Sequence, residues 1–145
     1  MKTLLATKRK ISDYFSQRPE ILAVYLFGSQ FKNSAGKDSD IDLGLLVGKE
    51  TSFGGFDAPE TRYTADLQKI LKIQVDIIDL TSAPVDFAFR VISEGEILSG
   101  INSRERIEFE ERLLRVYQDM KPFFDEYAKS IHEIARKGEI NVRYL

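Results

Sequence analysis

Two apolar runs, each joined to a short polar motif, limit the folds that this chain can adopt. The first run ends at Gly28-Ser29, and the second begins at Asp40-Ile41-Asp42 after a polar stretch. Runs rich in β-branched and aromatic residues are typical of buried strands. We therefore predict strands over residues 21–27 and 41–47, which would bring the two motifs onto neighbouring strands.

The carboxylates that open the second run are predicted to bind a divalent metal ion. Side chains two positions apart in a strand point to the same face, so Asp40 and Asp42 would project side by side. Such carboxylates repel each other unless a cation lies between them, and oxygen ligands without histidine or cysteine favour Mg²⁺ or Mn²⁺ over zinc. Gly44 follows on the same face and is expected to leave free space beside them.

Two simpler interpretations compete with this metal site. Aspartate in loops commonly satisfies a turn or caps a helix, and Asp38, Asp40 and Asp42 also match the first half of an EF-hand calcium loop. The calcium loop is excluded, because Leu43 and Lys49 occupy the positions that require glycine and glutamate. A turn or capping role stays open as the alternative.

The motif that ends the first run has the properties of a phosphate cradle. Gly28 lets the backbone approach a ligand closely, and Ser29 can start a short helix whose N–H groups face a phosphate. Lys32 is a candidate to balance triphosphate charge, with Lys37 and Arg62 as further candidates. Ordinary helix capping by Ser29 and simple solvation of the cations are the alternatives. A phosphate cradle beside metal-binding carboxylates indicates phosphoryl or nucleotidyl transfer.

A third carboxylate is expected from the apolar run near residue 76. Asp76 and Asp79 both lie there, and their spacing places them on opposite faces of one strand, so only one can meet the first pair. Asp76 is flanked by Val75 and Ile77, where an unpaired charge would be costly to bury. We favour Asp76 as metal ligand or as base for the acceptor, and Asp79 as a residue that satisfies a turn.

Further elements follow from periodicity and from the positions of proline and glycine. The pattern predicts strands over 73–80 and 97–98 and helices over 2–17, 60–72, 84–93 and from 103 onward. Ser82 is expected to cap the helix over 84–93. The fold class is α/β (α+β), with a small mixed sheet flanked by helices and a long C-terminal helical segment. Residues 1–145 form one domain, with a catalytic core over 1–100 and a helical extension over 101–145.

The C-terminal segment carries an apolar seam at intervals of four and three residues, typical of helix packing. Pro122 falls within it and should kink or divide the helix near Lys121. We expect most of the seam to pack in the core and part of it to contact another chain, in a homo- or hetero-oligomer. Its members are Leu113, Tyr117, Met120, Phe124, Tyr127, Ile131 and Ile134.

Composition and length limit which molecules can accept the transferred group and indicate where in the cell the protein acts. A formal net charge of −2 argues against stable binding to nucleic acid, which usually requires a basic surface. The chain of 145 residues also has no room for the extra domains that hold nucleic acid, so a protein or a small molecule is the expected acceptor. The lack of cysteine and of any stretch long enough to span a membrane fits a cytoplasmic protein.

These motifs together resemble the nucleotidyltransferase fold shared with DNA polymerase β, and within it the minimal nucleotidyltransferases (MNT), which are encoded beside HEPN-domain toxins. The signature of that family is Gly-Ser, about ten residues, Asp-x-Asp and a third carboxylate in a later strand. Gly28-Ser29, Asp40, Asp42 and Asp76 match it in this chain. The resemblance continues through 82–84 and 90–95 into the C-terminal helix. One departure is Asn33, which stands where the family commonly has a second glycine.

The resemblance implies an antitoxin that transfers AMP from ATP to a hydroxyl, a tyrosine, of a partner HEPN toxin. It implies two Mg²⁺ ions held by Asp40, Asp42 and Asp76, with ATP as substrate placed against Gly28, Ser29 and Lys32. One alternative is a module that neutralises a toxin by binding alone. Another is an enzyme that modifies a small molecule such as an aminoglycoside. The three carboxylates favour an enzyme, because binding alone does not require them.

Overall fold

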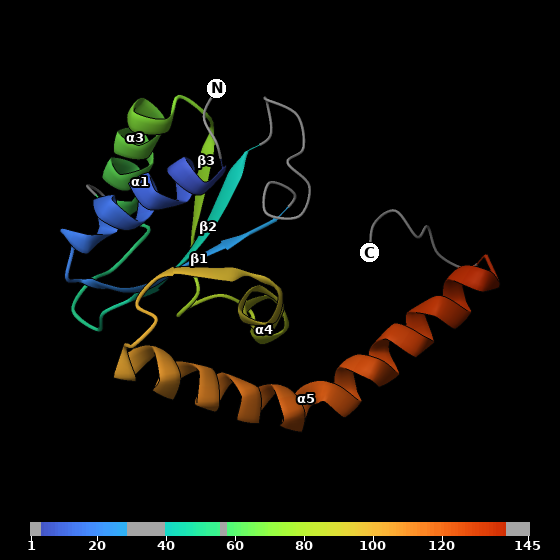
Figure 1. Ribbon diagram of the computed structural model, residues 1–145. Helices are drawn as coiled ribbons and strands as arrows, with labels where there is room; N and C mark the ends of the chain where they lie inside the picture. The colour runs from blue at the N-terminus through green and yellow to red at the C-terminus, as the bar shows by residue number, and fades with distance from the viewer. Residues whose placement is uncertain (1–3, 29–39, 56–57, 139–145) are drawn as a thin grey trace.

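The structure of this protein is a computed structural model that describes residues 4–28, 40–55 and 58–138 (Figure 1). Within these residues the elements run α1 (Leu4–Ser16), β1 (Ile21–Phe27), β2 (Ile41–Val47), α3 (Pro59–Leu71), β3 (Val75–Asp79), α4 (Val85–Glu94), β4 (Glu96–Ser99) and α5 (Arg104–Arg136). The two strands predicted first, 21–27 and 41–47, have the predicted bounds. The strand predicted over 73–80 is shorter and runs from Val75 to Asp79, although the Gln74 carbonyl oxygen already accepts a hydrogen bond from the backbone N–H of Ile41 at 2.9 Å.

The sheet has the order β3-β2-β1-β4, and its pairing is mixed. β1 lies antiparallel to both β2 and β4, whereas β2 and β3 run parallel. The small mixed sheet flanked by helices that the sequence predicts is therefore confirmed. The central position of β2 places its first residues beside the end of β1 and the start of β3.

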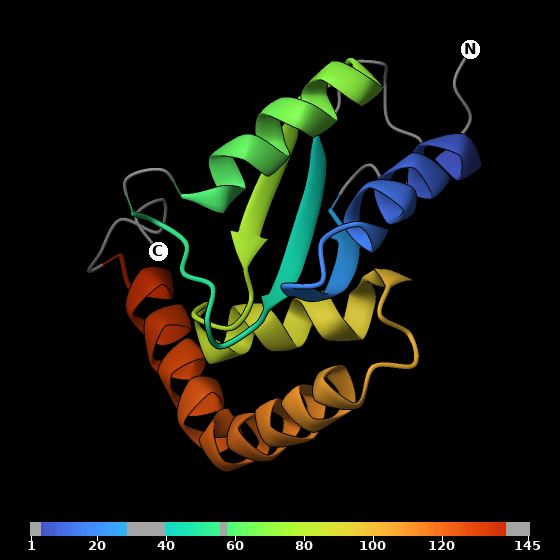
Figure 2. The same cartoon turned by 90° about the vertical axis from the view of Figure 1, so that its left-hand side faces the viewer.

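Alternation along the strands divides the core into two layers. On one face, Ile41, Leu43 and Leu45 pack with residues of α1 and α3, among them Ile11 and Leu67. On the other face, Tyr25, Leu46 and Leu80 pack with Ala88 and Val91 of α4 and with Phe109 and Leu113 of α5. Figures 1 and 2 show α1 and α3 on one side of the sheet, with α4 and α5 on the other.

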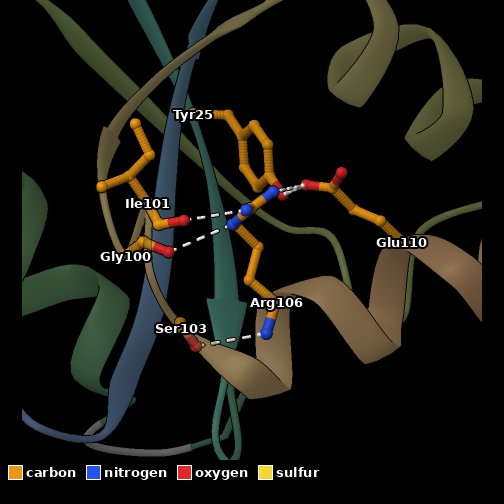
Figure 3. Close-up of polar contacts among 6 residues, drawn as sticks. All are labelled: Tyr25, Gly100, Ile101, Ser103, Arg106 and Glu110. Carbon is orange, nitrogen blue, oxygen red and sulfur yellow. Dashed lines mark hydrogen bonds and ion pairs between the residues drawn. The ribbon is translucent and has the colours of Figure 1, made fainter.

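A partly buried polar cluster links the beginning of α5 to the sheet (Figure 3). The hydroxyl of Tyr25, a fully buried residue of β1, donates a hydrogen bond to Glu110. Arg106 forms an ion pair with the same carboxylate at 2.6 Å and donates to the carbonyl oxygens of Gly100 at 3.1 Å and Ile101 at 2.9 Å. Burial first, and then the bond to Glu110, raises the pKa of Tyr25, so the hydroxyl stays protonated and continues to donate.

Ser103 caps the N-terminus of α5. The side chain of Ser103 accepts a hydrogen bond from the backbone N–H of Arg106 at 3.2 Å. By contrast, the predicted cap of α4 is wrong: Pro84 occupies the N-cap position without a side-chain bond, and Ser82 donates to Asp79 instead. In the first turn of α4 the backbone N–H of Phe87 donates to the carboxylate of Asp86 at 2.9 Å.

α5 remains one helix through Pro122 and bends about midway along its length (Figures 1 and 2). Proline lacks the N–H that would bond the preceding turn and clashes with its carbonyl, which accounts for a kink rather than a break. The prediction that most of the seam packs in the core is wrong. Of its members only Leu113 is buried, while Met120 and Tyr127 are 38% and 66% exposed. The predicted contact with another chain stays a prediction.

We predict that Tyr25→Phe lowers the free energy of unfolding by about 1–2 kcal/mol, because it removes the donor to a half-buried Glu110 carboxylate without changing the packed ring. Urea denaturation followed by circular dichroism would measure the loss. The matched control is Tyr127→Phe on exposed α5, which should change stability by less than about 0.5 kcal/mol. Equal stability of the Tyr25 variant and the unaltered chain would contradict the role given to this cluster.

Candidate active site

Three strand ends bring Gly28, Asp42 and Asp76 together. Gly28 directly follows β1, and β1 pairs with β2 so that Phe27 lies opposite Asp42. The parallel pairing of β2 with β3 places Asp42 opposite Asp76. Because the neighbouring strand residues point into the layer of α1 and α3, both carboxylates project from the other face, on the side of α4.

Gly28 lies against the carboxylate of Asp42, and any side chain at this position would force that carboxylate to move. Its φ is +91°, in the left-handed region that favours glycine. A Cβ atom at this position would overlap Oδ2 of Asp42. Glycine therefore has two roles at this position. It allows the turn that follows β1, and it lets the backbone lie next to the carboxylate of Asp42.

The pKa of Asp42 is raised above its ordinary value by burial and by the neighbouring acidic groups. Burial is the largest cause, followed by the negative charges of Asp76 and then of Asp40. Asp76 and Asp40 are both exposed, so water solvates their charges better than that of Asp42. Like charges held together in this way favour either a proton or a cation between them.

The donor set fits a hard divalent cation, because it consists of carboxylate oxygens. As they stand in the described part of the chain, the side chains do not bring three histidine, cysteine, aspartate or glutamate residues into a group arranged to hold a metal ion. The predicted residues Ser29 and Lys32, together with Lys37, Asp38 and Asn33, lie outside the described residues. The metal and cradle assignments accordingly stay predictions.

Two expectations about the surroundings of the carboxylates are wrong. Gly44 does not leave free space: a Cβ there would lie 2.9 Å from Cδ1 of Leu80, so the leucine side chain fills the position. Arg62 does not face the carboxylates, because it lies on α3, which covers the opposite face of the sheet and packs there through Tyr63. The spacing of residues in the sequence does not predict either result, because the first depends on where Leu80 lies and the second on which face of the sheet α3 covers.

Asp79 has the structural role that the sequence offered for it. Its carboxylate accepts hydrogen bonds from the backbone N–H of Thr81 at 2.8 Å, from the Thr81 hydroxyl, and from the hydroxyl of Ser82 at 3.0 Å. These bonds hold the turn between β3 and α4. Asp79 lies three residues after Asp76 in β3, so its side chain points to the opposite face of the sheet.

An aromatic pair borders the carboxylates and was not predicted. Phe27, which lies opposite Asp42, packs edge to face against Phe87 of α4, with 5.8 Å between ring centroids. Both rings are half-buried. The sequence places Phe27 directly before Gly28 but does not indicate its partner, since the contact depends on the tertiary placement of α4.

We predict that Gly28→Ala costs at least about 1 kcal/mol more stability than Gly54→Ala. Both glycines have positive φ, +91° and +88°, so the backbone strain of the two substitutions is alike. A Cβ at Gly54 would have no heavy atom within 4 Å, whereas one at Gly28 would overlap Asp42. Urea denaturation of the two variants would isolate that contact. Equal losses would show that the carboxylate can move aside freely.

Comparison with known proteins relates this geometry to characterised relatives. The chain is 25% identical over 103 residues to the protein adenylyltransferase MntA of Shewanella oneidensis, which covers 71% of this chain and 70% of the relative. Its fold matches a crystal structure of a toxin-antitoxin with AMP-PNP at a TM-score of 0.65, with 24% identity, over 83% of this chain and 98% of the other. It also matches a chain in the structure of a tri-AMPylated Shewanella oneidensis HEPN toxin in complex with MNT antitoxin. That match has a TM-score of 0.57 and 21% identity, over 83% of this chain and 98% of the other.

The family model described as polymerase beta, nucleotidyltransferase matches residues 9–104, which include the four strands of the described sheet and the residues Gly28, Asp40, Asp42 and Asp76. The match ends at the first residue of α5, so the long helix lies beyond the shared catalytic core. The family inferred from the sequence motifs is confirmed. This chain belongs to the polymerase β nucleotidyltransferase family and is a nucleotidyltransferase.

Proposed function

We propose that this nucleotidyltransferase transfers AMP from ATP to a tyrosine hydroxyl of a partner HEPN toxin and thereby acts as its antitoxin. The observation that carries the proposal is the contact of Gly28 with Asp42, beside Asp76 on the next strand. The relative from Shewanella oneidensis is a protein adenylyltransferase, and a structural neighbour is an MNT antitoxin in complex with an AMPylated HEPN toxin. A cytoplasmic location, where ATP is supplied, is part of the same proposal.

The reaction replaces one phosphorus–oxygen bond by another. The acceptor hydroxyl oxygen forms a bond to the α-phosphorus of ATP, and the bond from that phosphorus to the bridging oxygen of the β-phosphate breaks. Pyrophosphate leaves, and AMP remains on the acceptor. The hydroxyl proton passes to Asp76, the more exposed carboxylate of the facing pair. Gly28, which follows β1 beside Asp42, forms part of the proposed phosphate cradle together with Ser29.

Asp40, Asp42 and Asp76 are the residues that would hold Mg²⁺ in this proposal. Their oxygens suit the ion, and a cation would offset both the burial of the Asp42 carboxylate and the nearby charges of Asp76 and Asp40, which together raise the pKa of Asp42. When bound, Mg²⁺ supplies neutralisation of phosphate charge and a lower pKa for the acceptor hydroxyl. Ser29 and Lys32 complete the proposed nucleotide site.

Toxin neutralisation by binding alone is the competing function, since a structural neighbour is a complex of toxin and antitoxin. Occlusion would not require a glycine pressed against a carboxylate, nor facing carboxylates on neighbouring strands. Modification of a small molecule such as an aminoglycoside is the other alternative. The comparisons with toxin-antitoxin structures give it no support.

We predict that Asp42→Asn and Asp76→Asn each lower AMP transfer on the order of 10²–10³-fold, the loss expected when charge stabilisation of a few kcal/mol disappears from a transition state. The assay is incorporation of label from α-³²P-ATP into a co-expressed HEPN partner. Asp79→Asn is the matched control, because that carboxylate serves a turn on the other face, and its rate should stay within a few-fold of the unaltered chain.

The same variants separate transfer from occlusion. Growth rescue of cells that express the toxin should be lost with Asp40→Asn/Asp42→Asn if transfer neutralises the toxin. Rescue that persists unchanged in the double variant, with no label on the partner, would establish occlusion as the mechanism and contradict the proposal.

Removal of divalent cations should abolish transfer without unfolding the chain. We expect EDTA to lower label incorporation to background and added Mg²⁺ to restore it, because the carboxylates and the triphosphate are all negatively charged and repel one another without a cation between them. Circular dichroism in EDTA should be unchanged, since the core consists of apolar side chains. Full transfer in EDTA would remove the metal from the proposal.

A further inference from the structure

A groove lies between α4 and the distal half of α5 and has a volume of about 620 Å³. Figure 2 shows how the bend in α5 brings its distal half past the beginning of α4. Aromatic side chains from both helices line the groove: Phe87, Phe89, Tyr117, Phe124 and Tyr127. This concentration distinguishes the groove from the remaining surface of α5, where the exposed apolar residues are mostly aliphatic.

The aromatic rings of the groove are arranged to receive another ring. Phe89 and Tyr117 stack face to face, with centroids 3.8 Å apart and planes 4° from parallel. The rings of Tyr117 and Phe124 are tilted by 37°, with 6.0 Å between their centroids. Tyr127 is 66% exposed at the rim. Aromatic pairs favour offset and edge-to-face contacts, which such a lining offers to an incoming side chain.

The groove and the candidate active site adjoin at one ring contact. Phe87 lines the groove and packs edge to face against Phe27. Phe27 in turn lies opposite Asp42 in the register of β1 and β2. A side chain held in the groove near Phe87 is therefore on the face of the sheet from which Asp42 and Asp76 project.

The charges on the groove favour a basic occupant. Three carboxylates, Asp86, Glu94 and Asp125, line it beside a single cation, Arg90. Asp125 is paired at 2.7 Å with Lys121, which is itself more than half exposed and therefore well solvated. The lining remains acidic, and an acidic groove attracts a basic segment and repels an acidic one.

We propose that this groove binds the acceptor segment of the partner protein, and that the segment consists of the modified tyrosine flanked by lysine or arginine. The inference rests on the proposed function and adds to it the place of the acceptor and the sequence around its hydroxyl. Aromatic residues of the groove hold the tyrosine region by ring contacts, and the carboxylates select its basic neighbours. The hydroxyl is then presented to the nucleotide site beyond Phe27.

Steady-state kinetics with Phe124→Ala and Phe123→Ala test the inference. Phe124 lines the groove, whereas its neighbour Phe123 points away from it and is 73% exposed. With the partner protein as acceptor, Phe124→Ala should raise KM for the acceptor about tenfold, a loss typical of an aromatic contact, and leave KM for ATP and kcat within twofold. Phe123→Ala should change none of the three constants.

A second variant guards against misfolding. Tyr127→Ser removes an aromatic side chain at the rim, where exposure makes the fold insensitive to the change, and should raise KM for the acceptor severalfold. Thermal denaturation of all variants accompanies the kinetics. An unchanged KM for the acceptor in both groove variants would overturn the inference, and so would a rise confined to KM for ATP, which would assign the groove to the adenine base.

Synthetic peptides test the charge preference and keep the inference separate from the proposed function. One peptide carries a single tyrosine between lysines, and the other carries it between glutamates. We expect at least about tenfold more efficient labelling of the lysine peptide. Equal labelling of the two, or labelling of neither while the partner protein is still modified, would overturn the inference and leave the proposed function intact. Absence of label on the partner protein itself would contradict both the inference and the proposed function.

Discussion

The pairing register around β2 is the constraint on which the candidate site depends. β2 lies between an antiparallel neighbour and a parallel one, so its first residues meet the end of β1 and the beginning of β3. Complete burial of Ile41, Leu43 and Leu45 fixes that register. A slip by one residue would turn these side chains out of their layer and move Asp42 to the face covered by α1 and α3. Packing of the apolar residues thus determines where the acidic ones meet.

Much of this arrangement could be predicted because the information is local. The bounds of β1 and β2 follow from continuous apolar runs, and the shared face of Asp42 and Asp76 follows from strand periodicity once the strands are neighbours. The turn role of Asp79 could also be read from its place before Thr81 and Ser82. In each case a few adjacent residues carry the signal.

The errors arose where an outcome depends on contacts distant in sequence. Gly44 was expected to leave space, but Leu80 fills it from the end of β3. Arg62 is only a candidate from the sequence to balance triphosphate charge, and the structure places it on α3, which covers the opposite face of the sheet. The seam of α5 was expected to be core, yet only its first turns reach the sheet, because the helix bends after the cluster of Tyr25, Arg106 and Glu110. The ring of Phe87 could not be paired with Phe27 before the position of α4 was known.

Because α5 bends at Pro122, the number of residues between its start and this proline determines the direction in which its distal half points. Each residue of an α-helix advances the chain by about 1.5 Å and turns it by about 100°. Ser103 caps the helix where Arg106 and Glu110 bind the sheet, and Pro122 sets where it changes direction. One residue more or fewer between them would swing the distal half about a quarter of a circle around the helix axis. Chains related to this one should accordingly tolerate substitution in that interval far better than insertion or deletion.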